Sequence, residues 1–276
     1  MLKQRIITGL ILAPIAIGGI FFLPPFEFSL FIGFIIAVGG WEWANLAGFS
    51  KPVERVAFAA FISLLLYLST FLNPTYILAA SAFGWIVSLY LITQYPAKKT
   101  LWECRYRRLL IGIFVLVPAW TGLVAIRDAN TLLYGFQAVD TRYLILYIMF
   151  IVWGADVGAY FSGKAWGNKK LAPNVSPGKS WAGVYGGLAT TALFAIIASL
   201  MLDMSLVDTT WLLLITLITG VFSVVGDLLE SMLKRHRGIK DSSQLLPGHG
   251  GVLDRVDSLT AAVPVLTFLF ILVGWF

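Results

Sequence analysis

The sequence predicts an all-α integral membrane protein with about nine transmembrane helices and a cytoplasmic N-terminus. Hydrophobic residues make up 59% of the 276 residues and charged residues only 12%, whereas soluble domains carry about 25% charged residues. Apolar runs of about 20 residues, each long enough to cross the hydrocarbon core, recur along the chain. No polar interval is long enough to bury a core of its own. We therefore predict one polytopic domain over residues 1–276, with N-terminal helices in 1–142 and the functional helices and loops in 143–276.

Hydropathy predicts the individual spans in order. The N-terminal apolar segment lacks a small-residue cleavage site and further spans follow it, so it is interpreted as a helix and not as a removed signal. Pro24-Pro25 ends the first span, and Asn73-Pro74 separates the third span from the fourth. The predicted spans are 6–23, 27–47, 56–72, 75–95, 109–126, 143–162, 182–202, 209–229 and 258–276.

The basic residues predict the orientation of these spans. An N-terminus placed inside puts every Lys and Arg except Arg127 and Arg142 on the cytoplasmic side, as the positive-inside rule requires. The net charge of +6 therefore belongs to short loops between spans, which favours a membrane surface and phosphate-bearing ligands over nucleic acid. The single cysteine, Cys104, excludes an internal disulfide and a Cys-based metal cage.

Two polar features in the first half of the chain are interpreted without assigning them chemistry. Glu42 lies between Trp41 and Trp43 near a predicted helix end, where an acid in an aromatic belt usually extends to the membrane interface. The basic and aromatic interval at 96–108 is typical of an anchor to anionic lipid.

The longest strongly polar stretch is Val225–Ser258, between the last two predicted spans. It contains both histidines of the chain, and its carboxylates are Asp227, Glu230, Asp241, Asp254 and Asp257. Asp254 and Asp257 lie on one face if this segment is helical. A solvated loop that only fixes topology is the alternative, but such a loop needs Lys and Arg and not converging acids. The pattern favours an anionic ligand bound through a metal ion.

A second informative stretch is Trp153–Gly183. Asp156 falls inside an apolar span, which is costly unless the acid has a partner or a role. Glycines at 154, 158 and 163 are expected to allow close helix packing around it. The following SPGKS sequence at 176–180 resembles a phosphate-binding turn but lacks the spacing of a Walker A motif. The presence of Lys169 and Lys170 is explained by their contribution to membrane topology alone, and no chemical role is assigned to them.

Both stretches carry the motifs of a known family. The first contains, in order, Ser231-Met-Leu-Lys-Arg, Lys240-Asp241, Ser243, Leu246-Pro247, His249-Gly-Gly-Val and Asp254-Arg-Val-Asp257. This series resembles the signature of the bacterial CDP-diacylglycerol synthases, also called phosphatidate cytidylyltransferases. The resemblance covers most of the chain, including the N-terminal residues and the WEW sequence at 41–43. The second stretch is similar to the family pattern as well, except that Asn168 replaces a common Lys and Ala182 replaces a polar residue.

The resemblance implies a metal-dependent nucleotidyltransferase of phospholipid biosynthesis. Such an enzyme transfers the cytidylyl group of CTP to phosphatidic acid and gives CDP-diacylglycerol and pyrophosphate. It implies a place in the bacterial cytoplasmic (inner) membrane with the site facing the cytoplasm, contact with membrane lipid, and a homodimer. Nucleic acid is not expected as a partner.

The resemblance also indicates which residues to expect in the site. Hard oxygen ligands without cysteine favour Mg²⁺ or Mn²⁺, with a second cation as an option. Asp227 and Asp254 are the predicted metal ligands, and Asp257 lies beside them. His249 either binds phosphate or holds the glycine turn. The candidate catalytic residues are Asp227, Asp254, Asp257, Lys240, Asp241 and His249. The candidate substrate-binding residues are Asp156, Lys164, Ser176, Lys179, Ser180, Lys234, Arg235 and Arg255.

Three other functions are alternatives to this one. A CDP-alcohol phosphotransferase needs a DGxxAR sequence with spaced aspartates, which this chain lacks. An ion-coupled transporter would explain Asp156 and Asp227 but not the long polar stretch. A CTP-dependent lipid kinase shares the nucleotide and the compartment, and it differs in releasing CDP in place of pyrophosphate.

Overall fold

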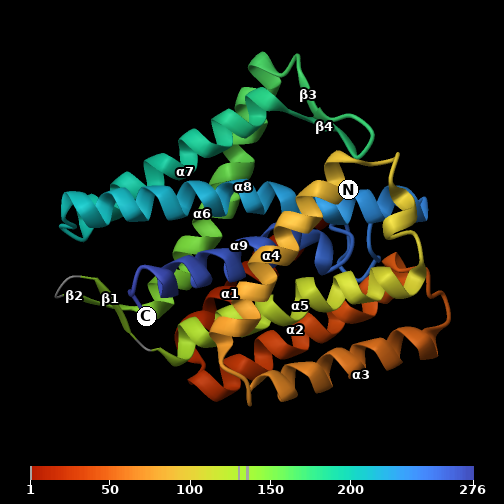
Figure 1. The fold of residues 1–276 in the computed structure, drawn as a ribbon, viewed down its shortest axis with the longest axis horizontal. Helices are drawn as coiled ribbons and strands as arrows, with labels where there is room; N and C mark the ends of the chain where they lie inside the picture. The colour runs from red at the N-terminus through yellow and green to blue at the C-terminus, as the bar shows by residue number, and fades with distance from the viewer. Residues whose placement is uncertain (1, 130, 135–136) are drawn as a thin grey trace.

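The computed structural model describes residues 2–129, 131–134 and 137–276 and consists mainly of helices (Figure 1). The predicted all-α class is therefore confirmed for the described part of the chain. Its helices are α1 (Leu2–Phe22), α2 (Pro25–Leu46), α3 (Pro52–Ser69), α4 (Pro74–Thr93), α5 (Arg105–Asp128), α6 (Thr141–Trp166), α7 (Trp181–Met201), α8 (Leu206–Arg237) and α9 (Leu253–Leu272), with a short 3₁₀ helix at Lys99–Leu101.

Each predicted span corresponds to one of these helices. Within the described residues, the eight helices α2 to α9 are long and apolar enough to cross a membrane, and α1 contributes a shorter apolar stretch at Ile7–Phe22. The sequence did not predict two short antiparallel hairpins, β1 (Thr131–Tyr134) with β2 (Gln137–Asp140) and β3 (Lys170–Ala172) with β4 (Ser176–Ser180). The SPGKS sequence is strand β4.

Local signals explain where the helices begin. Pro25, Pro52 and Pro74 occupy the first positions of α2, α3 and α4, where the missing N–H of proline costs nothing. Ser180 and Ser205 accept hydrogen bonds from backbone N–H groups in the first turns of α7 and α8. These hydroxyls satisfy amides that have no partner within the helix.

The polar stretch Val225–Ser258 is not the single loop that the sequence predicted. Helix α8 continues to Arg237 and ends at Gly238, which has a φ of 73°, because glycine adopts this left-handed conformation without penalty. The basic residues of its last turn also suit the negative end of the helix dipole. Helix α9 begins at Leu253, so only residues 238–252, called here the motif loop, connect the two helices.

Glycines allow close contact between the helices that carry the site. A Cβ atom on Gly158 of α6 would lie 2.6 Å from the backbone oxygen of Gly186 on α7, which confirms the predicted packing role. A Cβ on Gly226 of α8 would lie 2.6 Å from the backbone oxygen of Asp257 on α9. Helix α9 also packs against α4 and α5, so it lies between the α6–α8 layer and the N-terminal helices (Figure 1).

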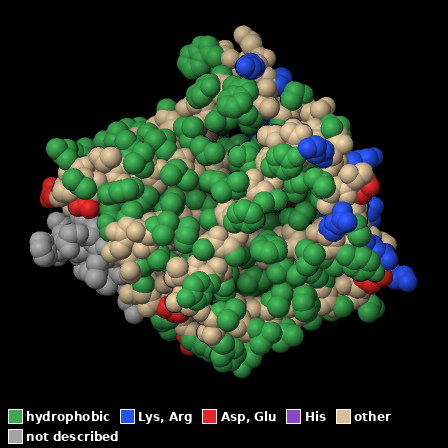
Figure 2. All heavy atoms as spheres, in the orientation of Figure 1, with side chains coloured by type: hydrophobic (Ala, Val, Ile, Leu, Met, Phe, Trp, Pro, Cys, Tyr) green, Lys and Arg blue, Asp and Glu red, His purple; other side chains and the backbone are tan. Residues whose placement is uncertain are grey.

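Arg127 and Arg142 lie at the same end of the molecule, where α1 ends. Arg127 donates to the backbone oxygen of Leu23 at 2.8 Å, and Arg142 donates to that of Phe21 at 3.2 Å. Hydrogen bonds from Arg142 also hold the pKa of Asp140, the N-cap residue of α6, below its usual value. On the face shown in Figure 2 the Lys and Arg side chains gather at the other end and along the top.

Candidate active site

A cavity of about 390 Å³ lies between α6, α7, α8 and strand β4. Small residues of α6 and α7 form much of its wall, including Gly163 and Gly183, so space remains between helices that otherwise touch. Four of its lining residues are candidate site residues from the sequence. They are Asp156, Lys164, Lys179 and Ser180.

Lys179 joins this cavity to the acids of α8. Its Nζ atom lies 2.6 Å from Oδ2 of Asp227, and about a quarter of each side chain is exposed to solvent. The other carboxylate oxygen, Oδ1 of Asp227, accepts a hydrogen bond from the Ser231 hydroxyl at 3.1 Å. Asp156 lies within electrostatic range of both Lys179 and Asp227. The two polar stretches, separate in sequence, therefore meet at this ion pair.

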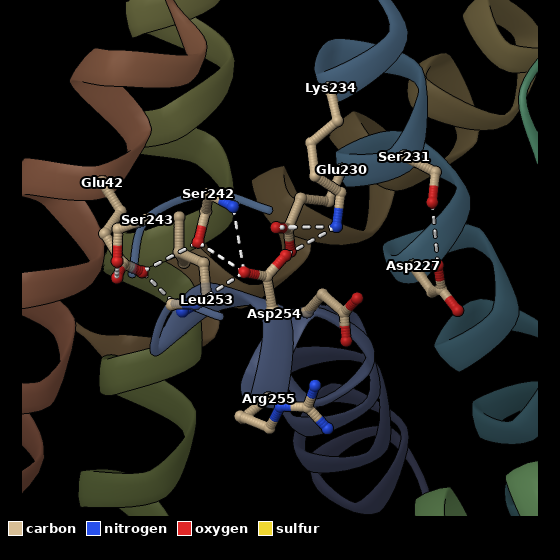
Figure 3. A network of polar contacts seen from close by, with 12 residues as sticks. Glu42, Asp227, Glu230, Ser231, Lys234, Ser242, Ser243, Leu253, Asp254 and Arg255 are labelled. Carbon is tan, nitrogen blue, oxygen red and sulfur yellow. Dashed lines mark hydrogen bonds and ion pairs between the residues drawn. The ribbon is translucent and has the colours of Figure 1, made fainter. Parts of the chain in front are cut away.

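A second cluster of charges lies deeper, between α8 and α9 (Figure 3). Nζ of Lys234 is 3.3 Å from Oε1 of Glu230 and 2.8 Å from Oδ1 of Asp254, and all three side chains are largely buried. Glu230 also interacts electrostatically with Asp257, which in turn interacts with Asp227. The sequence analysis named Glu230 among the carboxylates but gave it no place in the site, although it lies one helical turn after Asp227 and one turn before Lys234.

Asp254 also holds the two ends of the motif loop together. Its Oδ2 atom accepts hydrogen bonds from the Ser242 backbone N–H at 2.9 Å, the Ser242 hydroxyl at 2.9 Å and the Gly251 N–H at 2.7 Å. Asp257, one turn further along α9, accepts from the backbone N–H of Ser258 at 2.7 Å. Both acids therefore have defined orientations.

Glu42 belongs to the same network, and its interpretation as an acid reaching the membrane interface was wrong. Its side chain is fully buried and accepts hydrogen bonds from Ser243, Val252 and Leu253, and it shares the Ser242 hydroxyl with Asp254 (Figure 3). No local signal could have indicated this, because the partners of Glu42 lie about 200 positions along the chain.

Two predicted substrate-binding arginines donate hydrogen bonds to backbone oxygens. Arg235 donates through Nε to the oxygen of Val175 at 3.2 Å, which ties α8 to the β3–β4 hairpin. Arg255 donates through Nε and Nη2 to the oxygen of His249 at 3.1 and 2.8 Å. The backbone N–H of His249 donates to Leu246 at 2.9 Å, so His249 takes part in the glycine turn through its main chain.

The remaining predicted residues lie outside the cavity or serve as caps. Lys240 and Asp241 are exposed in the motif loop. Ser176 lies at the start of β4, opposite Ala172. Ser180 is buried and uses its hydroxyl to cap α7, so its hydrogen-bonding capacity is partly occupied.

The donor set suits a hard divalent cation. Carboxylate oxygens are the preferred ligands of Mg²⁺, which usually takes one or two of them together with water and substrate phosphates. Within the described residues no three Asp, Glu, His or Cys side chains form a complete cage. However, the two lysines of this network, Lys179 and Lys234, lie near five acids. Because the acids outnumber the lysines, a bound cation would be attracted to the network. These acids are Asp156, Asp227, Glu230, Asp254 and Asp257.

Known proteins resemble this chain over its whole length. The sequence pattern of the cytidylyltransferase family matches residues 3–273. A phosphatidate cytidylyltransferase of Pseudomonas aeruginosa is 49% identical over 278 residues, which cover 100% of this chain and 99% of the relative. Those of Haemophilus influenzae (38% identical, 99% of this chain and 100% of the relative) and Bacillus subtilis (33%, 98% and 98%) are similar over the full length as well.

The match covers both polar stretches and the helices that carry them, and the chain therefore belongs to the cytidylyltransferase family.

Proposed function

We propose that this chain is a phosphatidate cytidylyltransferase, which converts CTP and phosphatidic acid into CDP-diacylglycerol and pyrophosphate for phospholipid biosynthesis. The observation that carries the proposal is the Lys179–Asp227 ion pair, 2.6 Å long, at the point where the cavity meets the acids of α8 and α9. Full-length relatives named for this activity support it.

The reaction requires two anions to approach each other. A phosphate oxygen of phosphatidic acid forms a new bond to the α-phosphorus of CTP, and the bond between the α- and β-phosphates breaks as pyrophosphate leaves with the electron pair. The attacking phosphate is already ionised near neutral pH, so no strong base is needed. Lys164 and Lys179 line the cavity, where their charge can offset the repulsion and stabilise the leaving group.

Mg²⁺ would be held by Asp227 and Asp254, with Asp257 beside them, and Mn²⁺ or a second cation would suit the same oxygens. Bound there, the ion would neutralise the triphosphate and the departing pyrophosphate. Asp227 and Asp254 each already hold a lysine ammonium, at 2.6 and 2.8 Å, which supports their suitability for positive charge. Asp254 would exchange Lys234 for the cation while its other oxygen keeps the motif loop in place.

The lipid would reach the cavity sideways from the bilayer. Tyr160 lines the cavity and is also well exposed on the outer surface of α6, which supports an opening between membrane helices. CTP would enter from water at the end where the basic residues gather. A homodimer, which the family resemblance implies, stays a prediction.

The product distinguishes this activity from that of a CTP-dependent lipid kinase. Purified protein with Mg²⁺, phosphatidic acid and CTP labelled at the α-phosphate should yield a labelled lipid and an equal amount of pyrophosphate. Label in the lipid from γ-labelled CTP, with release of CDP, would instead establish a kinase and contradict the proposal.

The acids should differ in their effect on turnover. Asp227→Asn and Asp254→Asn remove the charge that would hold the cation, so each should abolish activity without loss of the folded protein. Asp257→Asn should lower turnover by about 10–100-fold if this acid only supports the ligands. The control is Asp203→Asn, at an exposed turn with a φ of 47° that asparagine also adopts. Near-normal turnover of Asp254→Asn at ordinary Mg²⁺ would show that the metal is held elsewhere.

Lys179 is predicted to bind substrate phosphate from the cavity wall. Lys179→Ala should raise the KM for CTP or phosphatidic acid, or lower kcat, by tenfold or more, which corresponds to about 1.4 kcal/mol per tenfold change. Lys169→Ala is the matched control, because Lys169 is an exposed lysine of the same segment that does not line the cavity. Steady-state kinetics with each substrate measure these changes in KM and kcat. If Lys179→Ala has the same KM and kcat as Lys169→Ala, then Lys179 contributes only to membrane topology.

The site is proposed to face the cytoplasm, which the asymmetry of Lys and Arg supports. A reporter that is active only in the cytoplasm should therefore be active when fused after Lys240 and silent when fused after Asp203. The opposite pattern would reverse the proposed orientation.

A further inference from the structure

We infer that Glu42, on α2, is a positioning residue for Asp254 and Asp257, and that it acts by clamping the motif loop onto the first turn of α9. The inference rests on the role proposed above for these two aspartates. Glu42 is fully buried, so its contribution would pass through the loop and not through contact with substrate.

The carboxylate of Glu42 caps a helix to which it does not belong. The N-cap residue of α9 is Val252, whose side chain offers no hydrogen bond, although a helix start leaves several N–H groups unpaired. Glu42 accepts from the N–H groups of Val252 at 2.9 Å and Leu253 at 2.7 Å. A negative charge at this position also interacts favourably with the helix dipole. Helix α2 therefore determines where α9 begins.

The same carboxylate holds the other end of the motif loop. Ser243 donates its hydroxyl to Oε1 of Glu42 at 2.5 Å, and the hydroxyl of Ser242 lies 3.2 Å from Oε2. Because Asp254 accepts from both the hydroxyl and the N–H of Ser242, Ser242 connects the two carboxylates directly (Figure 3). A shift of Glu42 would thus move the hydrogen-bond donors that orient Asp254.

The loop is shaped around this contact. A Cβ atom on Gly251 would lie 2.4 Å from Oε1 of Glu42 and 2.0 Å from the Ser242 hydroxyl, so only glycine allows so close an approach. Glu42 is fully buried, and an ionised acid in such a place is tolerated only when hydrogen bonds replace its lost water. Its hydrogen-bond donors all belong to the segment that precedes and starts α9, and this argues for control of that segment.

Glu42→Gln tests the inference, because glutamine keeps the shape but removes the charge and replaces one acceptor oxygen with a donor. The matched control is Glu27→Gln, an exposed acid at the other end of the same helix. Size-exclusion chromatography and thermal unfolding of the purified variants in detergent measure the folded fraction. Two further readouts are the Mg²⁺ concentration for half-maximal activity and the rate of tryptic cleavage after Lys240, which is exposed in the loop.

We expect folded Glu42→Gln to need at least tenfold more Mg²⁺ and to be cleaved after Lys240 several-fold faster than Glu27→Gln. A role in stability alone would reduce the folded fraction and leave the Mg²⁺ requirement of the remaining enzyme unchanged. An unchanged Mg²⁺ requirement together with an unchanged cleavage rate would overturn the inference. The cleavage rate needs no activity, so it reports on the clamp even if the proposed reaction is wrong.

Ser242→Ala tests whether Glu42 acts through Ser242. This variant removes only the hydroxyl between Glu42 and Asp254, and it should raise the Mg²⁺ requirement in the same direction. The double variant with Glu42→Gln should be no worse than the worse single variant, because both changes break one connection. Fully additive effects would overturn the inference. If Glu42→Gln does not fold, Ser243→Ala removes a single contact of the clamp and takes its place in both measurements.

Discussion

The acids between the membrane helices impose the main constraint on this structure. A carboxylate in an apolar environment is costly unless a cation or hydrogen-bond donors compensate its charge. Lys234 lies between Glu230 and Asp254 for this reason, and Lys179 lies against Asp227. The close contact of α8 with α9 at Gly226 brings Glu230 and Lys234 next to the acids of α9. The positions of the cavity and the motif loop both depend on this arrangement.

The two lysines differ in what they leave available for chemistry. Lys234 is largely buried between its acids, whereas Lys179 is partly exposed and also lines the cavity. A substrate phosphate can therefore compete for Lys179 more easily than for Lys234. Movement of Lys179 towards a phosphate would leave Asp227 with unpaired charge, which in turn would favour binding of a cation. The ion pair thus couples the proposed binding of nucleotide and of metal.

The site is built by both halves of the chain. The motif residues come from α6 to α9 and their connections, but α9 packs against α4 and α5, and Glu42 of α2 accepts hydrogen bonds from the start of α9. The N-terminal helices therefore provide more than anchorage in the membrane. Through Glu42 they form part of the surface on which the motif loop is held.

The sequence by itself determined the all-helical class, the approximate place of every span and most of the polar residues around the cavity. Apolar runs and proline or glycine punctuation are local signals, and they are readable because burial and backbone geometry act locally. The tertiary structure decided which charges meet. The Lys179–Asp227 pair and the contacts of Glu42 depend on helices that approach each other from distant parts of the chain. Helix α8 also continues past the predicted end at residue 229 to Arg237. The pairing of these groups follows from packing and charge compensation in three dimensions, which no local pattern encodes.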